Sequence, residues 1–337
     1  MLVGGTAQMI GSNPSVQNQP LLSVHNLKKR FPVKEGGFGQ QKKWIHAVDG
    51  VSLSLQRGEV LGLVGESGCG KSTLGRLILR LMDPTEGKIV FQGEDITHLS
   101  QRNLKKFRKK IQIIFQDPYA SLNPRMTIGQ ILEEPLMVHG LGNRQERKNQ
   151  VVQLLEKVGL SPDAQMRYPH EFSGGQRQRI GIARALSLKP ELIVADEPVS
   201  SLDVSIQAQV INLLQDLQEE FHLSLLFIAH DLNMVRHMSD QVAVMYLGRI
   251  VEMATAKDLY TRPQHPYTQA LLNSIPQADP KVKRNRNLLE GDLPSPIDLP
   301  KGCRFYSRCQ KRIPECLKED PPLEEGPQNH FTACILV

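Results

Sequence analysis

The sequence predicts an α/β fold built on a parallel sheet with helices on both faces. Three apolar runs have the length of buried strands, at residues 60–64, 192–195 and 225–229. Helical periodicity lies between them, most clearly at residues 73–82 and 206–221. Strands that alternate with helices favour a parallel sheet, because each helix carries the chain back to the start of the next strand.

The composition fits a soluble globular protein and leaves the type of partner open. Of 337 residues, 40% are hydrophobic and 23% charged, which excludes a disordered or fibrous chain. The formal net charge of +6 suits an anionic substrate, a membrane surface or nucleic acid equally well. No apolar run approaches the roughly 20 residues of a membrane-spanning helix. The first ten residues contain no Lys or Arg, so we expect no secretory signal and a cytoplasmic location.

The texture of the chain divides it into three parts. Residues 1–20 are rich in Gly, Ser, Asn, Gln and Pro, which predicts a flexible tail. Residues 21–260 carry the strand and helix patterns, including a two-residue alternation of apolar side chains at 51–55 and a long turn expected at 34–43. Residues 261–337 are rich in Pro and basic residues, with a positive run at 281–286. We therefore place a domain boundary near residue 260.

A phosphate-binding loop is predicted at residues 65–72. This segment fits the pattern G-x-x-x-x-G-K-S/T and lies between a predicted strand and a predicted helix. Glycines let backbone N–H groups surround phosphate oxygens, and the helix N-terminus adds a favourable dipole. Lys71 supplies a charge for the β- and γ-phosphates, and Ser72 a hydroxyl ligand for Mg²⁺. A purely structural Gly-rich turn is the alternative. The expected nucleotide-binding residues here are Gly65, Glu66, Ser67, Gly68, Cys69, Gly70, Lys71, Ser72 and Thr73.

Two adjacent carboxylates follow the buried strand at 192–195. Ligands of open α/β sheets bind at the carboxyl ends of the strands, where Asp196 and Glu197 fall. We assign Asp196 to Mg²⁺, and Glu197 to orienting and deprotonating an attacking water. His230, after the strand at 225–229, is a candidate donor to the γ-phosphate. The alternatives are solvated turn residues for the acidic pair and a structural role for the histidine.

Residues 172–176, Phe-Ser-Gly-Gly-Gln, resemble the signature motif of ABC-type ATPases, with Phe172 where Leu is usual. Two glycines weaken a helix start, and they make sense where a phosphate must approach the backbone closely. Further motifs of this family occur in order: Gln116 matches the Q-loop, residues 201–203 the D-loop, and His230 the switch histidine. Phe31 stands where the family places an aromatic residue that stacks on adenine. The resemblance covers about residues 21–255.

This resemblance implies a particular form of the fold and a larger site. We expect a parallel-sheet core, a small antiparallel β subdomain, and a helical subdomain at about residues 117–185. The resemblance implies ATP as substrate, with the catalytic residues Glu197, His230 and Gln116 and the Mg²⁺ ligands Ser72, Gln116 and Asp196. It adds to the nucleotide site the residues Phe31, Gln116, Asp196, Ser173, Gly174, Gly175, Gln176 and Asp203.

Segments outside these motifs resemble the ATPases of bacterial dipeptide and oligopeptide importers. They are residues 115–125, residues 265–272 and the cysteine-bearing tail. The whole chain is similar to the second of the two ATPase subunits of such a transporter, at the cytoplasmic face of the inner membrane. This implies as partners a second, different ATPase chain, two transmembrane permease subunits and an extracytoplasmic peptide-binding protein. Nickel, glutathione and some sugar importers share much of the pattern, so the cargo stays open.

Four of the five cysteines lie near the C-terminus: Cys303, Cys309, Cys316 and Cys334. In a cytoplasmic chain this clustering favours metal over disulfides. Their spacing has none of the two-to-four-residue gaps that are typical of structural zinc sites. Similarity to peptide-importer ATPases whose tails carry a 4Fe-4S cluster favours iron–sulfur, and zinc and unliganded thiols are the alternatives.

An ABC ATPase that acts on ribosomes or DNA is the alternative from another functional class. Basic residues at 105–110 could contact a phosphate backbone, or could form a solvated helix face. Translation-linked relatives usually hold two cassettes in one chain and repair-linked ones a long coiled-coil insertion, and this chain has neither. We therefore expect no nucleic-acid partner, and an ATP-hydrolysing subunit that powers peptide import.

Overall fold

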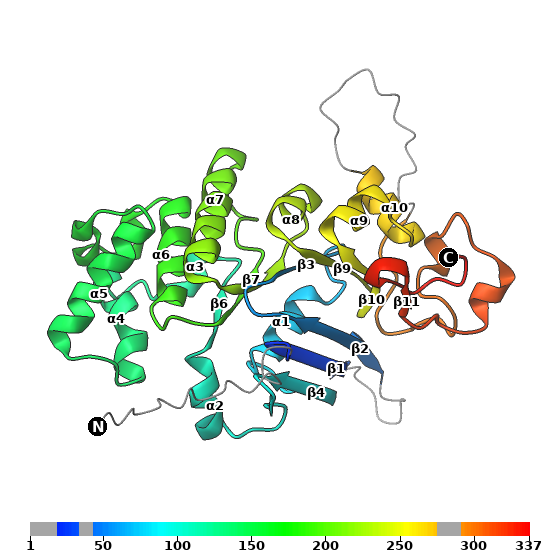
Figure 1. Cartoon of the computed structure of the whole chain (residues 1–337), viewed down its shortest axis with the longest axis horizontal. Coiled ribbons are helices and arrows are strands. Elements are labelled where there is room, and N and C mark those ends of the chain that lie inside the picture. Colours follow the sequence, from blue (N-terminus) through cyan, green and yellow to red (C-terminus); the bar gives the residue numbers. More distant parts are fainter. Residues whose placement is uncertain (1–18, 34–42, 275–290) are drawn as a thin grey trace, which may run out of the picture.

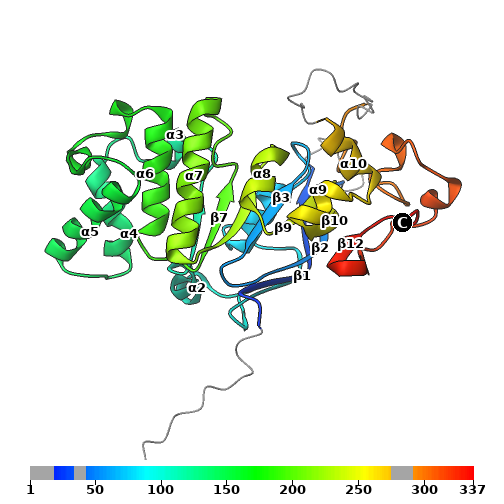
Figure 2. The ribbon, with the colours of Figure 1, turned by 45° about the horizontal axis from the view of Figure 1, so that its top comes forward.

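The computed structural model describes residues 19–33, 43–274 and 291–337 (Figure 1). Most of the predicted tail at 1–20, the turn expected at 34–43 apart from residue 43, and the positive run at 281–286 lie outside these residues. Figures 1 and 2 both place a group of helices at one end of the molecule and the C-terminal segments at the other, with the main sheet between them.

The predicted parallel sheet is confirmed, and it forms the larger part of an eight-stranded sheet. The strand order is β11-β12-β10-β9-β3-β8-β7-β6. Neighbouring strands from β9 to β6 run parallel, whereas β10, β12 and β11 continue the sheet in antiparallel fashion. The bounds are β3 Val60–Val64, β6 Ile111–Ile114, β7 Leu192–Asp196, β8 Ser224–Ile228, β9 Gln241–Tyr246, β10 Arg249–Thr255, β11 Glu324–Gly326 and β12 His330–Thr332.

Both faces of the parallel strands are covered, because alternate side chains enter two separate cores. On one face Ile193 and Phe227 pack with helices α7 (Val204–Phe221) and α8 (Leu232–Met238). On the other, Val194 and Leu226 pack with α1 (Lys71–Ile78) and with the second sheet. This two-sided burial explains why the strands appear in the sequence as continuous apolar runs.

The second sheet is a small antiparallel one, with the order β2-β1-β4-β5. Its strands are β1 Leu22–Pro32, β2 Trp44–Leu55, β4 Glu86–Phe91 and β5 Glu94–Asp95. The alternation at 51–55 is confirmed: Val51, Leu53 and Leu55 are buried and the serines between them are exposed. This sheet brings the start of β2 to the phosphate loop, where it forms one wall of the site described below.

Helices form a separate group between β6 and β7. They are α3 Pro118–Ser121, α4 Ile128–Val138, α5 Arg144–Lys157 and α6 Gly174–Leu186, with short 3-10 turns at Pro162–Met166 and Pro169–Glu171. Helix α2 (Gln101–Arg108) precedes β6. The expected antiparallel and helical parts of the fold are both present.

The helix predicted at 73–82 begins and ends earlier than expected. It starts at Lys71 and stops at Ile78, because Arg80 adopts a left-handed φ of 51°. The buried Arg80 guanidinium donates to the Ile96 carbonyl (2.9 Å) and the Asp83 carboxylate (2.7 Å), which draws the chain out of the helix.

The C-terminal segments are joined to the main sheet. Helices α9 (Ala256–Thr261) and α10 (Pro266–Asn273) follow β10, and 3-10 turns occur at Tyr306–Arg308, Pro314–Leu317 and Pro327–Asn329. Strand β12 then pairs with β10, a return over about 80 residues that sequence periodicity did not predict. Within the described ranges, none of the helices combines the length and the apolar character that crossing a bilayer requires.

Candidate nucleotide-binding site

The predicted phosphate loop joins β3 to α1, and its glycines are required by both backbone angle and space. Gly65 and Gly70 have φ of 150° and 112°. A Cβ atom at Gly65 would lie 2.2 Å from the Met245 carbonyl oxygen, and one at Gly70 would lie 2.1 Å from that of Ala47. Only glycine fits either position, so the loop can pack directly against the backbone at Met245 and Ala47.

Lys71 is held by the loop that it follows. Its ammonium donates to the carbonyl oxygens of Gly65 (2.7 Å) and Glu66 (3.0 Å), and the residue is 4% exposed. These carbonyls keep a buried positive charge at the phosphate end of the site, where a negatively charged ligand is favoured.

The groups assigned to Mg²⁺ lie together at the end of β7. The Ser72 hydroxyl donates to Asp196 Oδ1 at 2.8 Å. Burial raises the pKa of Asp196, and the hydrogen bond from Ser72 opposes that shift. A hydroxyl and a carboxylate are oxygen donors of the kind that Mg²⁺ prefers, so this pair fits the ion.

The three predicted catalytic side chains converge on one carboxylate oxygen. Gln116 Nε2 donates to Glu197 Oε2 at 2.8 Å, and His230 Nδ1 lies 3.6 Å from the same atom. Glu197 has a left-handed φ of 47°, an unfavourable backbone state for a residue with a Cβ. Its N–H donates to the Ile228 carbonyl (2.9 Å), which holds this conformation at the edge of the sheet.

Gln116 and Glu197 line a cavity of about 230 Å³, whereas His230 and Asp196 are not among its lining residues. Its walls include three residues that the sequence motifs did not identify: Ile45 and Ala47 at the start of β2, and Pro296 in the C-terminal segment. The Pro296 carbonyl accepts the N–H of His46 (3.0 Å), which fixes this contact. The motif residues that line the cavity are Ser67, Gly68, Gly70, Lys71, Ser72, Thr73, Gln116 and Glu197.

The signature segment lies apart from this cavity and is exposed at its tip. Ser173 caps α6: its Oγ accepts the Gln176 N–H (3.3 Å), while Gln176 Oε1 accepts the Ser173 N–H (3.0 Å). Gly175 also has an internal reason to be glycine, because a Cβ there would lie 2.4 Å from Ile206 of α7. Asp203, at the start of α7, is exposed. None of Ser173, Gly174, Gly175, Gln176 or Asp203 lines the cavity.

Comparison with known proteins decides the family. The sequence model described as "ABC transporter" matches residues 48–200, and "Oligopeptide/dipeptide transporter, C-terminal region" matches residues 251–316. The oligopeptide transport ATP-binding protein AppF of Bacillus subtilis is 55% identical over 325 residues, which cover 96% of this chain and 99% of AppF. The chain belongs to the ATP-binding proteins of ABC transporters. The dipeptide transport ATP-binding protein DppF of Haemophilus influenzae is 51% identical over 324 residues, which cover 96% of this chain and 99% of DppF.

Solved structures show the same ABC fold. The ATP-binding cassette MJ0796, in a dimeric post-hydrolysis state bound to ADP and Pi, matches with a TM-score of 0.62 and 29% identity. The match covers 98% of that chain but 70% of this one. The cassette cbiO1 of Clostridium perfringens gives a TM-score of 0.62 at 27% identity, over 91% of its own chain and 72% of this one. This ABC protein therefore carries a substantial part that those cassettes do not match.

Phe31 of this ABC protein is not among the residues that line the cavity. In the β1–β2 pairing it lies opposite Ile45, which does line it, so the two side chains share one face of the sheet. The Lys29 ammonium lies 5.2 Å from the Phe31 ring centroid. The adenine-stacking role remains a prediction.

The four tail cysteines surround a second, small cavity. Cys303, Cys309, Cys316 and Cys334 all line it, and all are free thiols. Burial raises the pKa of Cys303 to about 11, so this thiol is protonated at neutral pH unless a metal binds. Among the described residues, no three His, Cys, Asp or Glu side chains are arranged to hold a metal ion. The donor set suits iron or zinc, but the side chains do not converge as ligands of a single ion.

Proposed function

We propose that this chain hydrolyses ATP to drive the import of dipeptides and oligopeptides through a membrane ABC transporter. The observation that carries the hydrolytic part is the convergence of Gln116 and His230 on Glu197 beside the phosphate loop. The peptide cargo is supported by the relatives, which are described as oligopeptide and dipeptide transport proteins, and by the match of the C-terminal region.

The site residues have complementary roles in this reaction. Backbone N–H groups of residues 65–70 and the Lys71 ammonium bind the phosphates, and Ser72 and Asp196 would hold Mg²⁺, with Gln116 as a further oxygen ligand. When bound, the ion neutralises charge on the phosphates. Glu197 orients the attacking water and accepts its proton, Gln116 orients the Glu197 carboxylate, and His230 donates to the γ-phosphate.

A second ATPase chain completes the site. Because Ser173, Gly174, Gly175, Gln176 and Asp203 lie outside the cavity, we infer that they contact a nucleotide held by the partner's phosphate loop, and that the partner's equivalents contact the nucleotide held here. A solved relative, MJ0796, is described as dimeric. We propose a heterodimer with a related ATPase, bound to two permease subunits at the cytoplasmic face of the inner membrane and served by an extracytoplasmic peptide-binding protein.

We also propose that the four tail cysteines hold a 4Fe-4S cluster, with zinc as the alternative. One observation supports it: all four thiols line one cavity. Iron and sulfide analysis after anaerobic purification tests this. Four irons and four sulfides per chain are expected, and one equivalent of zinc alone would overturn it.

The chain divides, in this proposal, into a tail at 1–20, an ABC nucleotide-binding domain at 21–260 with a helical subdomain at about 117–185, and an extension at 261–337. The matches at 48–200 and 251–316 are consistent with that division. Limited proteolysis of the purified chain, with cleavage near residue 20, is the expected pattern.

Purification of the tagged chain from native membranes tests the assignment as a whole. We expect a different ATPase chain and two membrane subunits to co-purify, and the complex to hydrolyse ATP faster when a peptide-loaded binding protein is added. Stimulation by nickel, glutathione or a sugar instead would change the cargo. Salt-sensitive recovery with ribosomes or DNA would favour the rival class. That rival gains little from α2, where Lys106 pairs with Glu94 at 2.6 Å.

A further inference from the structure

The C-terminal tail contacts the phosphate loop through Glu66. The Arg308 guanidinium donates to both carboxylate oxygens of Glu66, at 2.6 and 3.0 Å. The Glu66 N–H donates to the Tyr267 hydroxyl of α10 at 3.0 Å. The Glu66 carbonyl, in turn, accepts the Lys71 ammonium at 3.0 Å. Glu66 is thus held by C-terminal residues at two points, while its third polar group holds the phosphate-binding lysine.

The environment of Arg308 makes this contact specific. Its side chain is 5% exposed, compared with 28% for that of Glu66. An arginine guanidinium stays protonated in proteins, so the charge is permanent. The Arg308 guanidinium lies 6.0 Å from the Tyr246 ring centroid, and the Tyr246 ring packs against those of Tyr267 (4.7 Å between centroids) and Phe305 (5.3 Å). An ion pair with two parallel hydrogen bonds fixes the orientation of the Glu66 carboxylate as well as compensating its charge.

The negative charge of Glu66 explains why its contact with Arg308 affects nucleotide binding. Glu66 belongs to the loop that must accept the phosphates, which carry several negative charges. A carboxylate there without a cation would repel them, since like charges a few ångströms apart interact strongly at a partly buried site. Arg308 neutralises that carboxylate and also restricts the loop before nucleotide binds.

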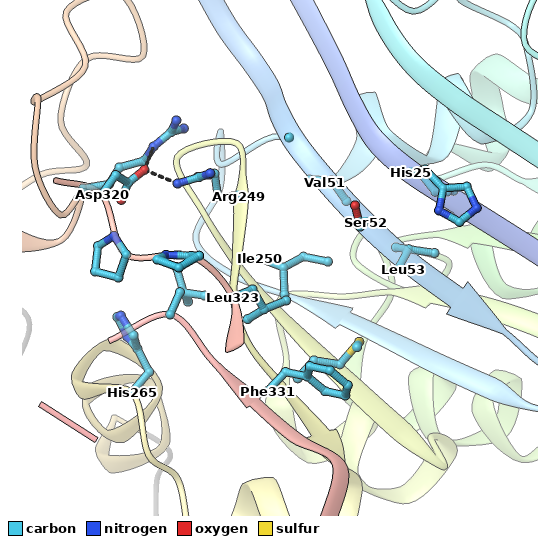
Figure 3. A pocket seen from close by; sticks show the side chains of 18 of the residues that line it. His25, Val51, Ser52, Leu53, Arg249, Ile250, His265, Asp320, Leu323 and Phe331 are labelled. Atoms are coloured by element: carbon cyan, nitrogen blue, oxygen red, sulfur yellow. Dashed lines mark hydrogen bonds and ion pairs between the residues drawn. The ribbon is translucent and has the colours of Figure 1, made fainter. Parts of the chain in front are cut away.

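The turn that carries Arg308 runs between two of the tail cysteines and is anchored at both ends. Cys303 is followed by the buried Arg304, which donates to Asp49 of β2 (2.5 Å) and to Asp320 (3.0 Å). Asp320 also pairs with Arg249 of β10, beside a cavity of about 460 Å³ between the tail and the antiparallel sheet (Figure 3). Arg308 is followed by Cys309, whose N–H donates to the Tyr306 carbonyl (3.3 Å).

We propose that Arg308 is a positioning residue for ATP binding: it holds and neutralises Glu66, and it makes nucleotide affinity depend on the Cys303–Cys309 turn. This regulation rests on the ATP-binding function proposed above. It extends that function, because it assigns the C-terminal extension a direct effect on the phosphate loop.

The test is the affinity of the purified full chain for a fluorescent ATP analogue with Mg²⁺. We expect Arg308→Gln to weaken binding by about 5- to 20-fold, the size of coupling through a neighbouring residue. Glu66→Gln removes the repelling charge, so the change at Arg308 should cost much less affinity in a Glu66→Gln chain than in the unmodified chain. The double variant Arg308→Gln/Glu66→Gln should recover most of the lost affinity, and added salt should reduce the Arg308→Gln effect.

Lys318→Gln is the control, because it removes a positive charge from an exposed position on the same tail outside the Cys303–Cys309 turn. Normal binding by Arg308→Gln would overturn the proposal, and so would a loss that Glu66→Gln does not repair, since that indicates general damage to the tail. Thermal unfolding identifies misfolded variants. Arg308→Lys, which keeps the charge but not the two-point contact, then replaces Arg308→Gln, with a smaller loss that Glu66→Gln again repairs.

The link to the cysteines has its own measurement. Cys309→Ser should weaken binding by about twofold or more in the unmodified chain and have no effect in the double variant. Unchanged affinity in Cys309→Ser would overturn the dependence on the turn. If the unmodified chain itself fails to bind the analogue, the proposed function fails instead, so the two failures are distinguishable.

Discussion

The phosphate-loop half and the signature half of the nucleotide site are built in opposite ways. In the first, Ser72 already contacts Asp196 and Gln116 already contacts Glu197, around a cavity bounded by buried strands. In the second, Ser173 and Gln176 are exposed, and the hydrogen bonds between them cap the first turn of α6. The proposed function therefore assigns the first set of groups to the nucleotide held by this chain, and the second set to a nucleotide held by the partner ATPase.

Glu197→Gln should have the largest effect, because it removes the base that both halves need. Turnover of the assembled transporter should fall at least about 100-fold, while ATP binding persists, since the amide can still accept from Gln116. Phosphate release and nucleotide binding measure the two effects. Glu220→Gln, an exposed carboxylate on α7, is the control. Near-normal hydrolysis by a complex whose two ATPases both carry the change would contradict the assignment.

Lys71→Ala should damage the first half alone. Loss of a charged donor to the phosphates should weaken nucleotide binding by the isolated chain about 10- to 100-fold. Isothermal titration with ATP and Mg²⁺ measures this. Lys106→Ala, at an exposed ion pair, should bind normally. An unchanged dissociation constant for Lys71→Ala would show that the loop does not bind the nucleotide phosphates.

Gly175→Ala should damage the second half alone. The added methyl would lie 2.4 Å from Ile206, so the start of α6 must shift, a strain of about 1 to 3 kcal/mol. We expect turnover in the complex to fall about tenfold while the isolated chain still binds ATP. Gly181→Ala, in the same helix with no atom within 4 Å of the new methyl, is the control. Equal turnover in the two variants would show that the packing of Gly175 has no functional role.

The smallest expected effect is a pH dependence of stability caused by His265, which lies beside the Tyr267 that contacts the phosphate loop. Burial lowers the pKa of His265 to about 4, and its Nδ1 accepts the N–H of Tyr267 (3.1 Å). The unfolded chain binds a proton near pH 6.5 and the folded one does not, so stability is complete above that pH and decreases as pH falls toward 4. Between pH 7 and 5.5 the unmodified chain should lose about 1 kcal/mol more than His265→Asn in denaturant unfolding. The Glu252–His330 pair next to His265 is common to both chains. Identical losses would exclude His265 as the cause.

Local motifs predicted most of the first half, because its chemistry is carried by short segments. A Gly-rich turn between a strand and a helix specifies the phosphate loop, and the carboxyl ends of adjacent parallel strands place Glu197 near His230. Motifs did not predict Pro296 in the cavity wall or the Arg308–Glu66 pair, whose members are 242 residues apart. The C-terminal residues that contact Glu66 left a weaker signal: Tyr267 lies in the segment 265–272, and Arg308 in the cysteine-bearing tail, both of which resemble peptide-importer ATPases.

The sequence by itself predicted the central parallel strands, the phosphate loop and the candidate catalytic side chains, since each depends on periodicity or on neighbours within a few residues. The tertiary structure decided where the tail lies: β12 pairs with β10, and Arg308 reaches the phosphate loop. Such contacts depend on the packing of buried side chains and on backbone pairing between distant segments. The sequence pattern of one segment does not specify these contacts, because the same segment could pair with many partners in many registers. The packing of the whole chain selects one of them.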